Sequence, residues 1–175
     1  MVEMLVAVSL IFLVLPGALS VSSKAITVSS FQKDTMIATY LAEEGQELVR
    51  IIRDRNTLAL LNGGFDDWNT GFDNELCVST PCTIDADEEV EKLSPGTGNL
   101  DNLDSSYRLY VDGNGFYRYT ASGGSPTRFY RGVYVIPVIG VSASNQVVVR
   151  SIVVWNTPFG RKKVVSSGFL SHWLR

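Results

Sequence analysis

The chain has 175 residues, of which 45% are hydrophobic and 19% charged, enough for one modest domain plus an additional element. The formal net charge of -3 gives no overall basic field, which argues against a protein that binds nucleic acid through general electrostatics.

The N-terminal segment Met4–Ser23 carries no charged side chain over 20 residues and is rich in Leu, Val, Ile, Phe and Ala. As a helix it would be ~30 Å long, enough to cross the hydrocarbon layer, so it predicts a transmembrane anchor. Pro16 and Gly17 weaken this helix, because proline removes a backbone donor and glycine lowers helix propensity. We expect a kink or local melting there. The competing interpretation is a signal peptide cleaved after Ser20, although a basic N-terminal region is missing.

Glu3 directly precedes the apolar run. An unpaired carboxylate is costly to bury, so Glu3 needs either a cation or the hydrated headgroup region. Both environments are compatible with its position.

The stretch Val2-Glu3-Met4-Leu5-Val6-Ala7-Val8 resembles the N-terminal segment of type IV prepilins and type II secretion pseudopilins. In that family a prepilin peptidase cuts after a glycine, the new N-terminal residue is methylated, and a glutamate pairs with a neighbouring subunit's amine. Glu3 aligns with that glutamate, so the resemblance implies a subunit-pairing carboxylate. The family's basic leader, cleavage glycine and phenylalanine do not precede Glu3 here, and a truncated sequence or misassigned start codon would explain this. Pro16 and Gly17 resemble the family's helix-breaking residues.

Beyond Lys24 the pattern becomes amphipathic and predicts one helix from near residue 1 to about residue 61, ended by Gly63-Gly64. Its apolar stripe comprises Ile37, Leu41, Leu48, Ile52 and Ala59, widened by Tyr40, Ile51 and Leu58. Glu44 and Arg55 fall on this stripe, where we expect their long side chains to extend to water or contact another subunit. The segment Tyr40–Asn56 also resembles the helix that follows the membrane segment in prepilin-like proteins.

Short β-branched and aromatic runs after Gly63 predict a β-rich head. We expect a hairpin from Tyr107 to Thr120 and strands at Phe129–Ile139, Gln146–Asn156 and Lys162–Leu170. Residues 63–106 are expected to be irregular, with one short helix. The predicted fold is α+β: residues 1–62 form a transmembrane and amphipathic helix that packs on an antiparallel β-sheet in a globular head of residues 63–175. The final strands, 147–155 and 168–173, resemble those of minor pilins and minor pseudopilins.

The two cysteines, Cys77 and Cys82, are separated by turn-forming residues. We expect a small disulfide-closed loop in an oxidising compartment, in preference to free thiols. A metal site is the least favoured interpretation, because no other ligands stand close in sequence.

Motifs for catalysis are not evident. The sole histidine, His172, has no nucleophile in a recognisable pattern, and no glycine-rich phosphate loop is found. Asp112 and Asn114 alternate as oxygen ligands for calcium would, but an ordinary hairpin turn is favoured over a calcium site. The acidic run at 85–89 is expected to be a solvated surface. Eight aromatic residues between 107 and 134, with Arg118, Arg128 and Arg131 among them, more often pack a sheet than bind DNA or sugars.

We therefore expect a structural subunit and not an enzyme: a minor pilin or pseudopilin of a type IV pilus, type II secretion or DNA-uptake filament. The chain would cross the cytoplasmic membrane once, with its head outside the cytoplasm, and later lie in a pilus or at the cell surface. Expected partners are other pilin subunits, membrane lipid, an inner-membrane assembly platform and prepilin peptidase, without a cofactor. The alternatives are a signal-anchored monomer that binds a glycan or other ligand, and a secreted soluble module.

Overall fold

A computed structural model describes residues 1–64, 67–72, 76–85, 92–138 and 146–172, without the side chains at positions 13–15, 18 and 76. The chain divides into two compact units, Met1–Ile37 and Ala38–Arg175. One long helix, α1 (Val2–Leu61), contributes to both units. Its end agrees with the predicted stop, where Gly63 adopts a φ of 84°.

In the first unit, every described side chain from Met1 to Lys33 is exposed. Several hydroxyl groups donate hydrogen bonds to the preceding turn of α1: Ser9 to the Leu5 carbonyl at 2.7 Å, for example. The helix is unbroken at Pro16 and Gly17, so the expected local melting is absent here, and the helix-breaking function during assembly stays a prediction. Among the side chains that the structure describes, no helix presents an apolar stretch of the length needed to cross a membrane.

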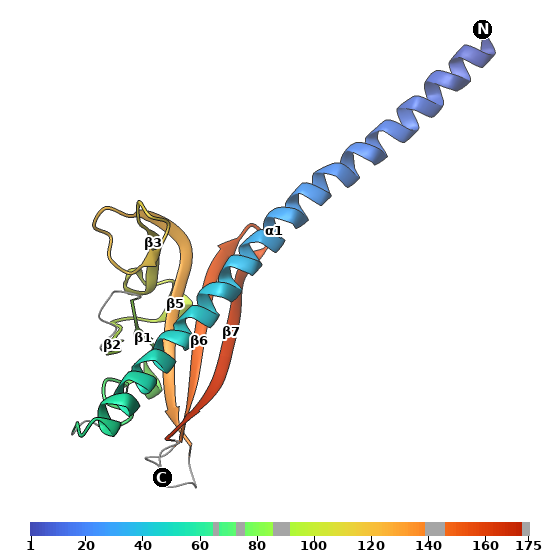
Figure 1. Cartoon of the computed structure of the whole chain (residues 1–175). Helices are drawn as coiled ribbons and strands as arrows, with labels where there is room; N and C mark the ends of the chain where they lie inside the picture. Colours follow the sequence, from blue (N-terminus) through green and yellow to red (C-terminus); the bar gives the residue numbers. More distant parts are fainter. Residues whose placement is uncertain (65–66, 73–75, 86–91, 139–145, 173–175) are drawn as a thin grey trace. The chain divides into compact units, whose positions relative to one another are not determined.

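The second unit combines the end of α1 with an antiparallel sheet, which confirms the α+β expectation (Figure 1). Its remaining elements are α2 (Leu76–Ser79), β1 (Cys82–Thr83), β2 (Ser94–Pro95), the 3-10 helices η1 (Leu100–Asn102) and η2 (Ser105–Tyr107), β3 (Arg108–Val111), β4 (Tyr117–Arg118), β5 (Ser125–Pro137), β6 (Gln146–Thr157) and β7 (Gly160–Ser171). The predicted hairpin and the three long strands are therefore present, and the chain between them holds several short elements.

The three longest strands of the sheet form the meander β5-β6-β7, in which β7 is an edge strand. In its register Val133 lies opposite Ser151, and Val149 lies opposite Gly168. The other edge of β5 pairs first with β3 and then, at Val133, with Cys82 of β1. Because side chains alternate along each strand, odd-numbered positions of β5 and β6 face α1 and even-numbered positions face away.

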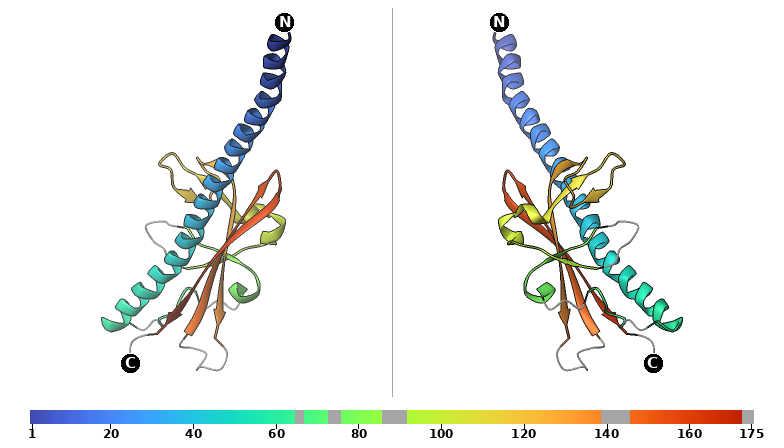
Figure 2. Two further views of the ribbon diagram at one scale, coloured as in Figure 1. Left: turned by 90° about the vertical axis from the view of Figure 1, so that its right-hand side faces the viewer. Right: turned by 90° about the vertical axis from the view of Figure 1, so that its left-hand side faces the viewer.

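The face of the sheet that lies under α1 holds the main core (Figure 2). Leu41, Leu48 and Ile52 of the predicted stripe are buried. The expected widening of the stripe was wrong: Tyr40, Ile51 and Leu58 are exposed, by 63%, 46% and 58%. The buried face is widened on its other side by smaller residues, Ala38, Ala42, Gly45 and Val49. Small side chains bring the helix axis closer to the sheet, which decides the side on which it packs.

Gly45 lies at a close approach between α1 and the sheet, because a Cβ added there would lie 2.5 Å from Ser151 Oγ of β6 and 3.2 Å from Arg131 Cδ of β5. We predict that Gly45→Ala destabilises the second unit by about 1 kcal/mol, since crowding of ~1–3 kcal/mol exceeds the gain in helix propensity. Urea unfolding of the full chain in detergent would measure this. The substitution should cost less in a Ser151→Ala background, and equal costs in both backgrounds would contradict the crowding explanation.

Candidate functional site

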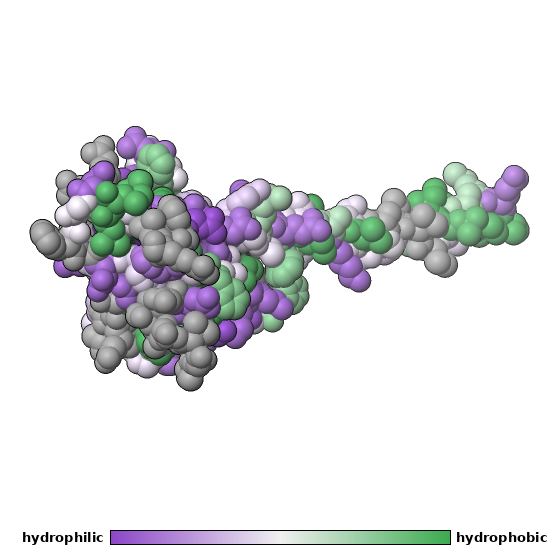
Figure 3. Space-filling model, turned by 60° about the horizontal axis from the view of Figure 1, so that its bottom comes forward, coloured by the Kyte–Doolittle hydropathy of each residue, from purple (hydrophilic) through white to green (hydrophobic). Residues whose placement is uncertain are grey.

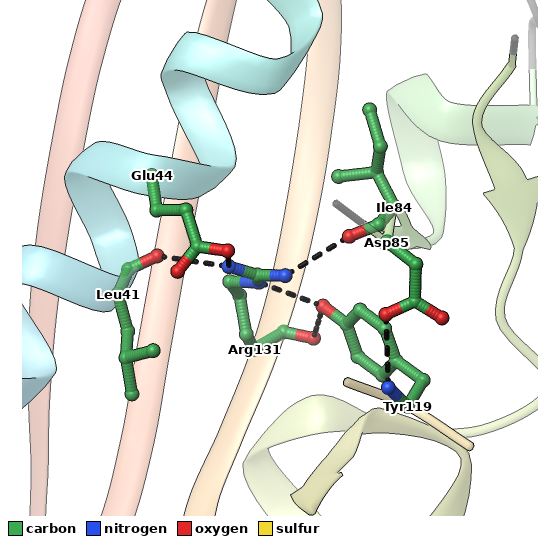
Figure 4. Close-up of polar contacts among 6 residues, drawn as sticks. All are labelled: Leu41, Glu44, Ile84, Asp85, Tyr119 and Arg131. Carbon is green, nitrogen blue, oxygen red and sulfur yellow. Dashed lines mark hydrogen bonds and ion pairs between the residues drawn. The ribbon is translucent and has the colours of Figure 1, made fainter. Parts of the chain in front are cut away.

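The most developed polar cluster in the described residues surrounds Arg131, a strand residue with an exposure of 0% (Figure 4). Its guanidinium donates to the Leu41 carbonyl at 3.3 Å, to the Ile84 carbonyl at 2.9 Å and to Tyr119 Oη at 3.1 Å. Glu44 Oε1 lies 3.3 Å from Nη1. Arg131 therefore joins α1, the sheet and the segment after β1.

Tyr119 completes the cluster from the other side. Its hydroxyl donates to the Arg131 carbonyl at 2.8 Å, and its ring centroid lies 5.3 Å from the guanidinium carbon. Its backbone N–H donates to Asp85 Oδ1 at 2.9 Å. Each nitrogen of the Arg131 guanidinium thus has a partner of fixed position, as a buried charge requires.

The electrostatics favour a permanently charged cluster. Burial by itself would lower the pKa of Arg131, but Tyr119 and Glu44 outweigh it, and the pKa is raised. Burial raises the pKa of Tyr119, against an opposing effect of Arg131. Both groups keep their protons at neutral pH, so the cluster combines an ion pair with hydrogen bonds. Its geometry fastens three segments of the unit together.

Sequence patterns had not singled out this cluster. Glu44 was noted on the apolar stripe, where contact with water or another subunit was expected, and the structure pairs it with Arg131 instead. The available signal was the alternation Phe129, Arg131, Val133, Val135, which places Arg131 on the inward face of β5. Since Arg131 is fully buried, it is not available to DNA, in contrast to the suggestion made from its aromatic neighbours.

The predicted disulfide is present. It joins Cys77 of α2 to Cys82 of β1, with a Cα–Cα distance of 5.4 Å. Both cysteines have an exposure of 0% and belong to the main core with Trp68 and Phe72. The bond therefore closes a six-residue loop beside the segment whose Ile84 carbonyl accepts from Arg131.

The remaining predicted site residues lie apart from this cluster. Glu3 stands in the first turn of α1, exposed, and Pro16 and Gly17 lie farther along the same helix. Asp112 is engaged in its turn, because Oδ1 accepts from the N–H groups of Asn114 and Phe116, each at 2.9 Å. Its Oδ2 lies 3.1 Å from Arg118 Nε. In the described part of the chain no group of three or more His, Cys, Asp or Glu residues is placed to hold a metal ion.

His172 packs against Trp68, with ring centroids 6.1 Å apart. Of the eight aromatic residues considered as a ligand platform, Tyr107 and Phe129 are buried, Phe116 is exposed and the other five are half-buried. In the acidic run, Asp85 is described and half-buried, and residues 86–89 lie outside the described residues.

Comparisons of the chain with protein-family models, with curated proteins and with solved structures give no match.

We predict that Arg131→Leu destabilises the second unit by ~3–5 kcal/mol, because Glu44, two carbonyls and Tyr119 lose their common donor. Arg150→Leu provides the matched control, since Arg150 is an exposed residue of the neighbouring strand and should change stability by less than about 0.5 kcal/mol. Urea unfolding followed by the fluorescence of the buried Trp155 would compare them. Equal stability of the two variants would show that the cluster does not stabilise the fold.

We also predict that the pair Cys77→Ser and Cys82→Ser lowers stability by ~2 kcal/mol, the amount expected for closing so short a loop. A reductant should shift the unfolding transition of the natural chain and leave that of the double variant unchanged. A transition that reductant does not move in either protein would contradict this role of the disulfide.

Proposed function

We propose that this chain is a membrane-anchored structural subunit of a filament, of the type IV pilin and pseudopilin class, as a minor subunit. The observation that carries the proposal is an apolar helical segment whose side chains find no cover within their own unit. Leu5, Phe12 and Val21 are exposed by 69%, 72% and 67%. Figure 3 shows apolar side chains at the surface of the N-terminal part of α1.

An apolar helix of this kind needs another environment, because contiguous exposed apolar surface marks contact with lipid or protein. Lipid would cover Met4–Ser23 before assembly, and the equivalent helices of other subunits would cover it in the filament. Hydroxyl groups in the segment, such as those of Ser9 and Ser23, are already bonded to helix carbonyls, which reduces their cost in lipid.

Glu3 is the proposed site of subunit pairing. In the first turn of α1 its carboxylate is exposed and precedes the apolar run directly. When that run is buried among neighbouring helices, an unpaired carboxylate would be costly, and the N-terminal amine of a neighbour would offset the cost. An inner-membrane assembly platform would then lift the subunit from the cytoplasmic membrane, after prepilin peptidase has processed its leader.

The second unit supports the same placement. A buried disulfide between Cys77 and Cys82 is characteristic of a compartment outside the cytoplasm. The described part of the head is held together by a hydrophobic core and a buried ionic cluster. Of the two alternatives, a monomeric ligand-binding protein would depend on the aromatic platform, of which Phe116 alone among the eight residues is exposed.

We predict that Glu3→Ala lowers incorporation into filaments by ~10-fold or more, the scale expected when one partner of a buried ion pair is lost. Immunogold labelling and quantification of sheared fibres would measure incorporation. Glu43→Ala is the matched control, an exposed carboxylate farther along α1, and it should assemble normally.

Membrane insertion should be preserved in Glu3→Ala, as resistance to alkaline extraction would show. Normal incorporation of this variant would rule out the proposed pairing. A mature chain recovered as a soluble monomer without Met4–Ser23 would rule out the filament subunit itself.

A further inference from the structure

Two exposed phenylalanines occupy hairpin turns of the second unit. Phe159 lies in the turn between β6 and β7 and is 74% exposed, and Phe116 lies in the turn between β3 and β4 and is 59% exposed. The hydrogen bonds of these turns fix their shape: Thr157 Oγ1 accepts from the Phe159 N–H, and Asp112 accepts from the Phe116 N–H. Neither ring packs on the core, so both are presented to the surroundings.

Both turns lie at the same end of the unit (Figure 2). The register places Val111 opposite Ser125, at the start of β5, and Trp155 opposite Phe129, so the β3–β4 and β6–β7 turns extend in the same direction.

This is also the end at which α1 enters the unit. Ser166 donates to Gln46 at 2.7 Å, and Arg53 Nη1 donates to the Ser171 carbonyl at 3.4 Å, so β7 and α1 run in the same direction. The start of β7 therefore lies toward Ala38.

Basic side chains accompany the two phenylalanines. Arg161, Lys162 and Lys163 follow Phe159 after Gly160 and are exposed, as is Arg128 near the start of β5. The acidic residue described at these turns, Asp112, is paired with Arg118. In a chain with a formal net charge of -3, three consecutive basic residues therefore stand beside the β6–β7 turn. We call Phe116, Phe159, Arg161, Lys162 and Lys163 the basic-aromatic end.

We propose that the basic-aromatic end docks on a membrane surface that contains anionic phospholipid. Phenylalanine rings enter the interface between headgroups and acyl chains, and arginine and lysine bind lipid phosphates beside them. Along the chain, Ala38 follows the uncharged run by 15 residues, so this end of the unit is the one nearest the membrane segment in sequence. The inference rests on the proposed membrane anchor and adds a second lipid contact, which holds the head against the bilayer until assembly.

The contact is expected to be weak and reversible. Each basic residue near an anionic surface changes association by about fivefold, and salt screens this attraction. Docking by the basic-aromatic end would therefore be released when assembly begins and neighbouring subunits cover the head, as the anchor leaves the bilayer.

The experiment uses the full chain reconstituted in vesicles of phosphatidylcholine, with or without phosphatidylglycerol, and with brominated acyl chains. Phe159→Trp supplies a fluorescent reporter whose added emission is compared with that of the natural chain. Leu58→Trp is the matched control, an exposed position near the opposite end of the unit. Brominated lipid should quench the added emission at position 159 when phosphatidylglycerol is present, and salt should reverse this, whereas position 58 should be unaffected.

The charge requirement is tested in the Phe159→Trp chain. Arg161→Gln with Lys163→Gln should reduce the docked fraction, by about fivefold for each charge removed. Arg55→Gln with Arg150→Gln removes two exposed charges elsewhere in the unit and should leave quenching unchanged. An equal loss of quenching in both double variants would overturn the assignment of docking to the basic-aromatic end.

Flotation of the vesicles separates this proposal from the anchor. Chains that float with phosphatidylcholine vesicles but show no quenching at position 159 in anionic vesicles would overturn lipid docking and leave the anchor intact. Chains that do not float with phosphatidylcholine vesicles would overturn the anchor. Binding of a single-stranded oligonucleotide that requires Arg161 and Lys163, without lipid quenching, would assign the surface to nucleic acid and overturn the proposal.

Discussion

The second unit depends on the burial of one positive charge. A guanidinium with an exposure of 0% is tolerated only where acceptors surround it, and Arg131 finds them on three separate segments. Its side chain extends from β5 toward α1, so the helix must present the Leu41 carbonyl and Glu44 at that point. This requirement fixes the position of α1 along the sheet more strictly than apolar contacts would, because those contacts are not directional.

Close approach of the helix follows from the same requirement. The guanidinium reaches Leu41 and Glu44 only if α1 lies near the strands, and Gly45 leaves the space above Ser151 for it to do so. On the other side of Arg131, the Ile84 carbonyl accepts a hydrogen bond from the guanidinium. Ile84 follows the Cys77–Cys82 disulfide by two residues. The ionic cluster and the disulfide thus both constrain residues 77–84, in the middle of the irregular chain between α1 and β3.

The first unit differs in its surroundings. Its described side chains up to Lys33 are exposed, and hydroxyl groups such as those of Ser9 and Ser23 donate to carbonyls of their own helix. A helix of this composition acquires a defined environment only from lipid or from other helices. In the proposed subunit the two units therefore have different functions. The second unit is stabilised by its own internal contacts, and the first is available to contact the membrane and neighbouring subunits.

The sequence by itself determined the elements with a strong local signal. The helix end at Gly63, the three long strands and the Cys77–Cys82 loop follow from periodicity, turn chemistry and proximity along the chain. Only the tertiary structure decided which side of α1 is buried, and it exposed Tyr40 where an apolar stripe was predicted. It also brought Glu44 and Arg131, 87 positions apart, into one ion pair. Local patterns show how often apolar residues recur along the chain. The partner of a buried charge and the distance between two packed surfaces depend instead on residues that are distant in sequence. Both are therefore determined only when the segments pack together.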